Sequence, residues 1–247
     1  MSDDVITKVH QVEHGAWGEV ILNRPERKNA IVGPLGEGLA EGIERLDGNE
    51  NVKAIVLSGA GGAFCSGLDL KAFNADPAPA WKAQFQHIWR GAHKALLECN
   101  TPIIGAMERY AINGGAALAF ACDILVVGKE SFLQVGEVQI GMGAPYNLAW
   151  LSLRYSESQY AQLALIGDRV KGPELLNLGF AQYCVEDEEV LSHAQNLAAR
   201  IGNFHGEGPI RIKSSLRAHR RESADEWFDR FTQATGENPA PQSMQNR

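Results

Sequence analysis

Residues 54–70 read AIVLSGAGGAFCSGLDL, and this stretch decides how the chain folds. Residues 54–57 form a short continuous apolar run, which is typical of a strand buried on both faces. The run ends in a cluster of glycines, and the chain then passes through Ser66 and Gly67 into a new helical turn. A buried strand that ends in glycines and leads into a helix is a pattern of α/β proteins.

The segments on either side of this stretch complete the α/β pattern. Upstream, residues 5–23 alternate between apolar and polar side chains as two strands. They are followed by apolar residues at helical spacing between residues 35 and 46. Downstream, helices and buried strands are predicted in alternation at residues 80–98, 103–106, 114–121 and 123–127. The fold class is therefore α/β, with parallel strands covered on both faces.

Helical patterns dominate the chain from residue 145 onward, at residues 148–153, 156–165, 173–178, 190–201, 209–216 and 224–235. We therefore expect an α/β core over residues 1–190 and a helical C-terminal region over residues 191–247. The apolar stripe of Trp227, Phe228 and Phe231 suits either a contact between subunits or the core of the chain itself. The sequence leaves both possibilities open.

The composition excludes several classes of protein. The chain has 23 lysines and arginines against 30 aspartates and glutamates, a net charge of −7, so no overall positive charge attracts nucleic acid or an acidic membrane. The longest nearly apolar run, residues 111–127, is interrupted by Asn113 and Asp123 and is shorter than the roughly 20 residues of a membrane span. The acidic N-terminus lacks the apolar segment of a secretion signal. We expect a cytoplasmic protein that binds neither nucleic acid nor membrane.

The sequence also lacks the common metal and nucleotide fingerprints. It contains no G-x-G-x-x-G, no P-loop, no G-x-S-x-G elbow and no H-E-x-x-H. The 7 histidines are scattered, and the 4 cysteines lie far apart without a C-x-x-C pair, so we expect them to be reduced and buried. No metal site is expected.

Two glycine-rich strand ends remain as candidates for chemistry, residues 58–70 and residues 113–118, NGGAAL. Both place backbone N–H groups at or near the start of a helix, where they can bind an oxyanion or a phosphate. The same glycines also permit close packing of a helix on a strand. Each segment taken alone is therefore compatible with a functional or a purely structural role.

Four stretches together are more specific, because they occur in the order and at the spacing of one known family. The chain resembles the crotonase, or enoyl-CoA hydratase/isomerase, superfamily over roughly residues 5–230. The stretches are LNRPERKNAI (22–31), AIVLSGAGGAFCSGLDL (54–70), INGGAALAFACDILVV (112–127) and GEVQIGM (136–142). The resemblance implies a crotonase-like spiral of ββα units with a C-terminal helical trimerisation region, and a homotrimer or a dimer of trimers.

The resemblance also implies the shared chemistry of the family. In crotonases two backbone N–H groups bind the thioester oxygen and stabilise an enolate, and the matching residues here are Leu68 and Gly114. Losing one such donor typically costs a factor of about 10²–10³ in rate. The matching carboxylate is Glu137, with a surface ion pair as the alternative role for this residue.

Coenzyme A would be bound as part of an acyl-CoA substrate, with no prosthetic group. The resemblance implies that residues 66–70 wrap the adenine and pantetheine through backbone contacts, and it makes four cations candidates for the phosphates. The expected CoA contacts are Ser66, Gly67, Asp69, Leu70, Arg24, Arg27, Lys28 and Lys71. Each single cation could instead be an ordinary surface residue.

The chain departs from the family's hydratases at the second catalytic carboxylate. The family's first glutamate falls on Ala117, and its P-G-x-G-G turn is replaced by GAPYN, residues 143–147. Tyr110, Tyr146 and Asn147 are candidates for an assisting polar group. Residues 235–241 also differ from the family's usual end, which leaves the contacts of this tail to CoA undetermined.

A single glutamate suffices for an isomerase, because one carboxylate can take a proton from C2 and return it at C4. Isomerase-like proton transfer is therefore the favoured reaction. The alternatives are an enoyl-CoA hydratase or hydratase-lyase and, from another class, a catalytically reduced CoA-binding subunit. The aromatic residues Trp81, Phe85, Trp89 and Tyr146 either line a pocket for an aromatic or branched acyl chain or belong to the core.

Overall fold

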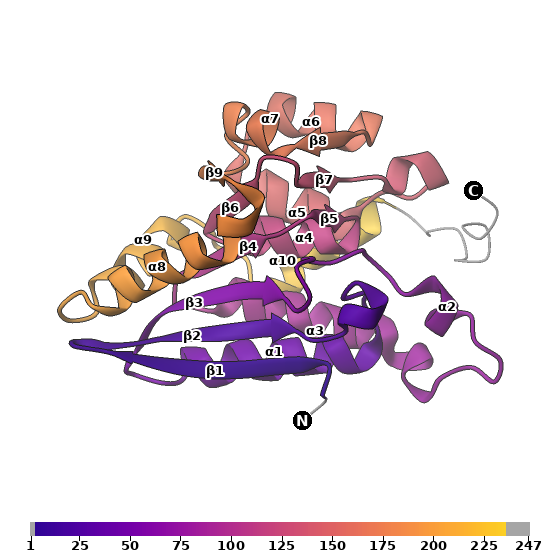
Figure 1. Cartoon of the computed structure of the whole chain (residues 1–247). Coiled ribbons are helices and arrows are strands. Elements are labelled where there is room, and N and C mark those ends of the chain that lie inside the picture. Colours follow the sequence, from indigo (N-terminus) through magenta and orange to yellow (C-terminus); the bar gives the residue numbers. More distant parts are fainter. Residues whose placement is uncertain (1–2, 236–247) are drawn as a thin grey trace.

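The computed structural model describes residues 3–235, and the tail that follows lies outside the described residues (Figure 1). Six strands form the larger sheet in the order β1-β2-β3-β4-β6-β9. β1 and β2 pair antiparallel as a hairpin, and the strands after them join in parallel. The strands are β1 (Val5–Val12), β2 (Gly15–Leu22), β3 (Val52–Gly59), β4 (Ile103–Met107), β6 (Ile124–Gly128) and β9 (Tyr183–Val185).

A smaller sheet of three short strands builds the second layer of the spiral. Its strands are β5 (Tyr110–Ile112), β7 (Phe132–Gln134) and β8 (Arg169–Lys171). One unit consists of β4 in the larger sheet, β5 in the smaller sheet and then the helix α4 (Gly114–Ala121). The next unit has the same order, with β6 in the larger sheet and β7 in the smaller sheet before the next helical segment. Cys65 extends the pattern through a parallel bridge to Ala111. The predicted spiral of ββα units is confirmed.

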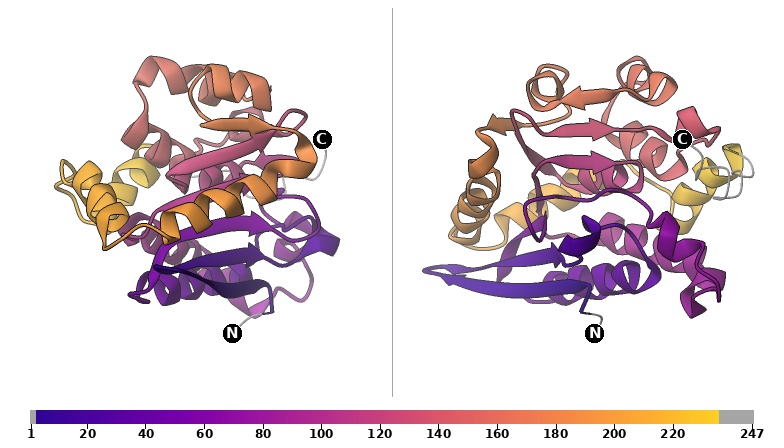
Figure 2. Two further views of the ribbon diagram at one scale, coloured as in Figure 1. Left: turned by 60° about the vertical axis from the view of Figure 1, so that its left-hand side comes forward. Right: turned by 45° about the vertical axis from the view of Figure 1, so that its right-hand side comes forward.

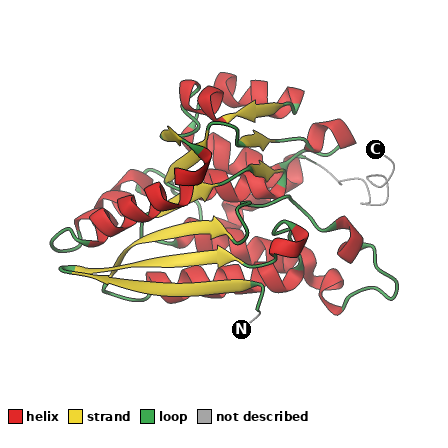
Figure 3. Ribbon diagram, viewed as in Figure 1, coloured by secondary structure: helices red, strands yellow, loops and turns green. Residues whose placement is uncertain are grey.

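Helices cover the larger sheet on both faces, as Figures 2 and 3 show. α1 (Gly33–Asp47) and α3 (Phe85–Glu98) pack on one face, and α8 (Val190–Gly202) crosses the other. Side chains of β3 alternate between these two cores: Ile55 and Leu57 face the first, and Ala54 and Val56 face α8. The prediction of parallel strands buried on both faces is confirmed.

The remaining helices agree with the sequence pattern, with two differences at their boundaries and two additional strands. The helix predicted over residues 80–98 is split into a 3-10 turn, η2 (Ala80–Gln84), and α3. Pro145 occupies the first turn of α5 (Pro145–Arg154), so this helix begins before residue 148. β8 and β9 interrupt the helical second half, and strands of three residues are too short to show alternation.

The other helical segments are α2 (Leu70–Phe73), α6 (Glu157–Ile166), α7 (Gly172–Asn177), α9 (Gly208–Arg217), α10 (Ala224–Ala234), η1 (Pro25–Arg27), η3 (Glu137–Ile140) and η4 (Asp187–Glu189).

An ion cluster fastens α9 to the start of β6. The Asp123 carboxylate accepts from Lys213 at 2.7 Å, from Arg217 at 3.0 Å and from Arg154 at 3.3 Å. It also accepts from the Ile103 N–H at 2.8 Å. Burial alone would raise the pKa of Asp123, but the three cations outweigh it and hold that pKa below its ordinary value.

The last helix, α10, packs on its own chain. Trp227 and Phe228 are buried in the main core, and Phe228 contacts the rings of Trp150 and Tyr146. Of the two roles left open for the aromatic stripe, intrachain packing is therefore confirmed for these two residues. α10 also lies beside α3 and α5, which places it next to the candidate site.

The cysteines are free thiols, as predicted. Cys65, Cys99 and Cys122 are buried, and Cys184 is half-buried. Burial raises the pKa of the Cys65, Cys99 and Cys122 thiols to about 12, which keeps them protonated and unreactive.

Candidate active site

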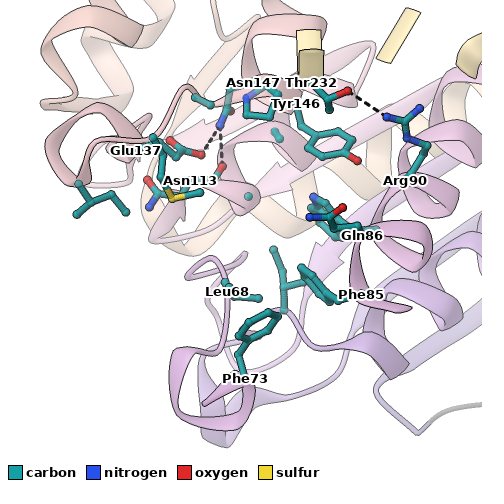
Figure 4. Close-up of a pocket in the computed structure, with 18 of the residues that line it drawn as sticks. Leu68, Phe73, Phe85, Gln86, Arg90, Asn113, Glu137, Tyr146, Asn147 and Thr232 are labelled. Atoms are coloured by element: carbon teal, nitrogen blue, oxygen red, sulfur yellow. Dashed lines mark hydrogen bonds between the residues drawn. The ribbon is translucent and has the colours of Figure 1, made fainter. Parts of the chain in front are cut away.

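A cavity of about 1270 Å³ lies between the loop before α2 and the helices α3, α4, α5 and α10 (Figure 4). It brings together segments far apart in sequence. The expected site residues among its lining are Ser66, Leu68, Leu70, Gly114, Glu137, Tyr146 and Asn147. Ala117 also lines it, so the position of the missing carboxylate faces this cavity.

The backbone around Leu68 leaves its N–H free. Ile31 forms a parallel bridge with Leu68, in which the Ile31 N–H donates to the Gly67 carbonyl at 2.8 Å and the Asp69 N–H donates to the Ile31 carbonyl at 2.9 Å. Since successive peptide groups of an extended strand alternate in direction, the Leu68 N–H points away from Ile31. Among the described residues none accepts it.

Gly114 begins α4, so its N–H has no partner within the helix. The residue before it, Asn113, has a positive φ of 52° and does not cap the helix with its side chain. Its Oδ1 accepts instead from the Gly136 N–H at 2.8 Å. A Cβ on Gly115 would lie 2.5 Å from the Cys65 carbonyl oxygen, so glycine is required where α4 meets the loop that carries Leu68.

Glu137 is a buried carboxylate at the start of η3, only 8% exposed. Its Oε1 accepts from Asn147 Nδ2 at 2.8 Å, and its Oε2 has no hydrogen-bond partner among the described residues. Burial raises the pKa of Glu137 to about 7, against the weaker opposing effect of its hydrogen bonds to its own backbone and to Asn147. The group can therefore both take and release a proton near neutral pH.

Asn147 joins this carboxylate to the start of α4. It is 1% exposed, and its Nδ2 also donates to the Asn113 carbonyl at 3.1 Å. The sequence offered Asn147 as a candidate for an assisting polar group, but this double contact depends on the packing of α5 against α4. Tyr110 is not among the residues that line the cavity, and its ring packs against Phe132 instead.

Two of the expected phosphate cations turn toward Asp69. Its carboxylate accepts from Arg24 at 3.1 Å and from Arg27 at 2.8 Å, and it caps α2 by accepting from the Ala72 N–H at 3.0 Å. Burial would raise the pKa of Asp69, but these donors lower it to about 2. This cluster rigidifies the loop that carries Leu68.

The other expected CoA contacts lie on this loop, at the start of α2 and at the end of η1. Lys28 and Lys71 are exposed, and Arg27 remains 41% exposed despite its ion pair. Ser66 and Leu70 are partly exposed and line the cavity, whereas Gly67 is buried against the Ile112 carbonyl with a φ of 88°. A positive φ with a carbonyl 3.0 Å from a Cβ position requires glycine there.

Aromatic rings form one wall of the cavity. Phe85 and Trp89 from α3 and Tyr146 from α5 line it, together with Phe73 from α2. Trp81 is not in the lining and packs behind Phe73 and Phe85, at ring-centroid distances of 5.9 and 5.7 Å. Three of the four aromatic residues singled out from the sequence therefore reach the cavity.

Within residues 3–235 no group of three or more His, Cys, Asp or Glu side chains could hold a metal ion. In the same part of the chain no helix is long and apolar enough to cross a membrane.

The comparisons with known proteins agree with this fold. The family model for enoyl-CoA hydratase/isomerase matches residues 14–233, and the chain belongs to this family. The chain is 31% identical to the probable enoyl-CoA hydratase echA12 of Mycobacterium leprae over 207 residues, covering 80% of this chain and 70% of that protein. It is 27% identical to the 1,2-epoxyphenylacetyl-CoA isomerase of Escherichia coli, covering 88% and 84%.

Solved structures give the same result. A crystal structure of an enoyl-CoA hydratase/isomerase from Mycobacterium paratuberculosis superposes with a TM-score of 0.83 at 25% identity, covering 99% of this chain and 97% of that one. The protein is therefore an acyl-CoA enzyme of the crotonase superfamily, and the relatives' names include both hydratases and isomerases.

Proposed function

We propose that the protein catalyses proton transfer at the carbon next to an acyl-CoA thioester, with Glu137 as the only acid/base. The observation that carries this proposal is the burial of Glu137, which brings its pKa to about 7, in a cavity that also contains Leu68 and Gly114. A carboxylate with a pKa near the working pH is suited to both halves of a proton transfer.

In the favoured isomerisation, the thioester oxygen of a 3-enoyl-CoA accepts from the backbone N–H groups of Leu68 and Gly114. Glu137 removes a proton from C2, and the negative charge moves to the thioester oxygen as an enolate. The protonated Glu137 then delivers the proton to C4, while the double bond moves from C3–C4 to C2–C3. No other acid or base is needed, which fits the alanine at position 117.

The CoA part of the substrate would lie on the loop from Ser66 to Leu70. Lys28, Lys71 and the exposed part of Arg27 are the cations best exposed for its phosphates, and Arg24 and Asp69 would act by holding the loop. We also propose the family's assembly, a homotrimer or a dimer of trimers. Sedimentation equilibrium of the purified chain measures this directly.

The test of the reaction is turnover of a 3-enoyl-CoA by wild type and Glu137→Gln. The amide keeps the shape and can still accept from Asn147, but it cannot carry the proton. We expect a loss of at least about 10³-fold in kcat, in line with removal of an essential acid/base. Full turnover by the variant would exclude Glu137 from this role.

Hydration of an enoyl-CoA is the second candidate, favoured by Asn147. Its Oδ1 is a buried acceptor without a partner among the described residues, close to Glu137 and next to the cavity. After a small rearrangement it could accept from a water molecule that Glu137 activates. Efficient hydration of crotonyl-CoA would place this reaction ahead of isomerisation, whereas tight acyl-CoA binding without any α-proton exchange would identify a CoA-binding subunit.

A further inference from the structure

The cavity extends beyond the proposed reaction centre to an end of different chemistry. Figure 4 shows Glu137 and Asn147 on one side, Gln86 and Arg90 on the other, and Tyr146 between them. At this second end the lining side chains come from α3 and α10 and are Gln86, His87, Arg90, Thr232 and Gln233. The loop that carries the expected CoA contacts lies elsewhere in the lining, so this end is the place for the acyl group.

Between the reaction centre and this end, the cavity wall is aromatic and held rigidly. Phe85 and Trp89 lie nearly parallel, with centroids 6.4 Å apart and 5° between their planes, and Trp89 meets Tyr146 edge to face at 6.3 Å. Tyr146 is in turn stacked at 4.4 Å on His93, which is fully buried and accepts from Trp150 Nε1–H at 2.9 Å. A flat ring packs well against such surfaces in offset or edge-on contact.

The polar end has donors and acceptors, but its strongest charge is already paired. Arg90 forms an ion pair with Asp229 and donates to Thr232 Oγ1 at 3.1 Å. Burial raises the pKa of the Tyr146 hydroxyl, and the nearby Arg90 guanidinium partly opposes this. Gln86 and His87 are exposed, so this end of the cavity is open to solvent. A neutral hydroxyl can join this group of donors and acceptors, whereas a carboxylate would find the Arg90 charge already paired with Asp229.

We propose that the acyl group of the substrate is an aromatic ring carrying a neutral hydrogen-bonding substituent, such as a phenolic hydroxyl, at the end farthest from the thioester. The ring lies against Phe85, Trp89 and Tyr146, and the substituent bonds to Tyr146 and Gln86. This specificity rests on the proposed function, since it takes Leu68, Gly114 and Glu137 as the place of the thioester.

The test is the dissociation constant of four saturated thioesters, measured by titration calorimetry at one pH. They are 4-hydroxyphenylacetyl-, phenylacetyl-, 4-carboxyphenylacetyl- and hexanoyl-CoA. We expect the phenol to bind about three- to tenfold more tightly than the plain ring, the gain of one net hydrogen bond. The carboxylate and the hexanoyl chain should both bind more weakly than the plain ring.

Three variants assign the preference to residues. Tyr146→Phe and Gln86→Leu should each reduce the phenol-to-plain-ring ratio, and at least one of them should bring it close to one, with little change for the plain ring. Gln84→Leu is the matched control, because Gln84 is exposed, lies outside the cavity lining and makes no capping bond. This control should keep the wild-type ratio.

Three results would overturn the specificity. The phenol could bind no more tightly than the plain ring, the hexanoyl chain could bind more tightly than either neutral ring, or the phenol-to-plain-ring ratio could be unchanged in both variants. The proposed function is checked separately by exchange of the α-protons of hexanoyl-CoA with deuterated solvent. Exchange without the ring preference rejects the specificity alone. The ring preference without exchange of any thioester rejects the proton transfer and leaves the binding preference standing.

Discussion

At the scale of single residues, the site is dominated by one carboxylate placed where its charge is disfavoured. The pKa of Glu137 is raised to about 7 because the side chain is buried and only one of its two oxygens is hydrogen-bonded. A raised carboxylate pKa favours the protonated form in the folded state. The ionised form therefore costs stability as the pH rises from about 4.5 to about 7.

Glu137→Gln should consequently stabilise the protein while it removes activity. At pH 8 we expect a gain in the free energy of unfolding of about 3 kcal/mol as an upper estimate, and at pH 4 almost none. Urea unfolding of both proteins at the two pH values measures the difference. A gain that is equal at both pH values would mean that ionisation of Glu137 is not its cause.

Asn147 affects the pKa of Glu137 as well as its position. Its hydrogen bond lowers that pKa against the larger effect of burial, so Asn147→Leu should shift the acidic limb of the kcat profile to higher pH. We expect kcat to fall about tenfold while KM changes little. Asn177→Leu, at an exposed position in α7, is the matched control and should leave the profile unchanged. A reduced rate with an unshifted profile would indicate a loss of packing only.

At the scale of elements, ionic contacts decide where the last helices lie. Asp123 at the start of β6 faces Lys213 and Arg217 of α9, and Lys213 is only 4% exposed. The lowered pKa of Asp123 means that this carboxylate contributes stability above its ordinary pKa and loses that contribution as the pH falls through its lowered value. α9 should therefore loosen in acid before the apolar cores do.

Removing the Asp123 charge should be strongly destabilising, because it leaves buried cations uncompensated. For Asp123→Asn we expect a loss of about 3–5 kcal/mol in the free energy of unfolding at pH 7. Asp225→Asn is the control, since Asp225 forms an exposed pair with Lys94 and such pairs contribute at most about 1 kcal/mol. Urea unfolding of both variants tests this, and equal losses would contradict it.

At the scale of the whole molecule, helices from the C-terminal region complete both cores. α8 covers one face of the larger sheet, and α10 supplies Trp227 and Phe228 to the other core and Thr232 to the cavity. The predicted division at residue 190 therefore describes the order of elements along the chain. We expect it not to correspond to two parts that unfold separately.

Phe228→Ala tests this coupling. Truncation of a fully buried phenylalanine should cost about 3–5 kcal/mol, and unfolding followed by tryptophan fluorescence and by far-ultraviolet circular dichroism should remain one coincident transition. Two separated transitions would show that residues beyond 190 unfold as an independent region.

The fold class and most of the helices and strands could be predicted from the sequence, because these depend on local periodicity and on glycines at strand ends. The family could be predicted from the resemblance of four motifs in their order and spacing. Leu68, Gly114 and Glu137 were predicted as site residues from motifs of fixed spacing, and all three line the cavity. The same spacing showed that alanine occupies position 117, where the family's hydratases have a glutamate. The short strands β5, β7, β8 and β9 were missed because three residues show no period.

Which side chains contact one another depends on the tertiary structure. The burial that shifts the pKa of Glu137, the amide of Asn147 between Glu137 and Asn113, and the inward turn of Arg24 and Arg27 toward Asp69 all depend on contacts between distant segments. So does the packing of α10 over the cavity. The solvation and hydrogen bonding of a side chain depend on packing in three dimensions, so they cannot be predicted from the spacing of residues along the chain.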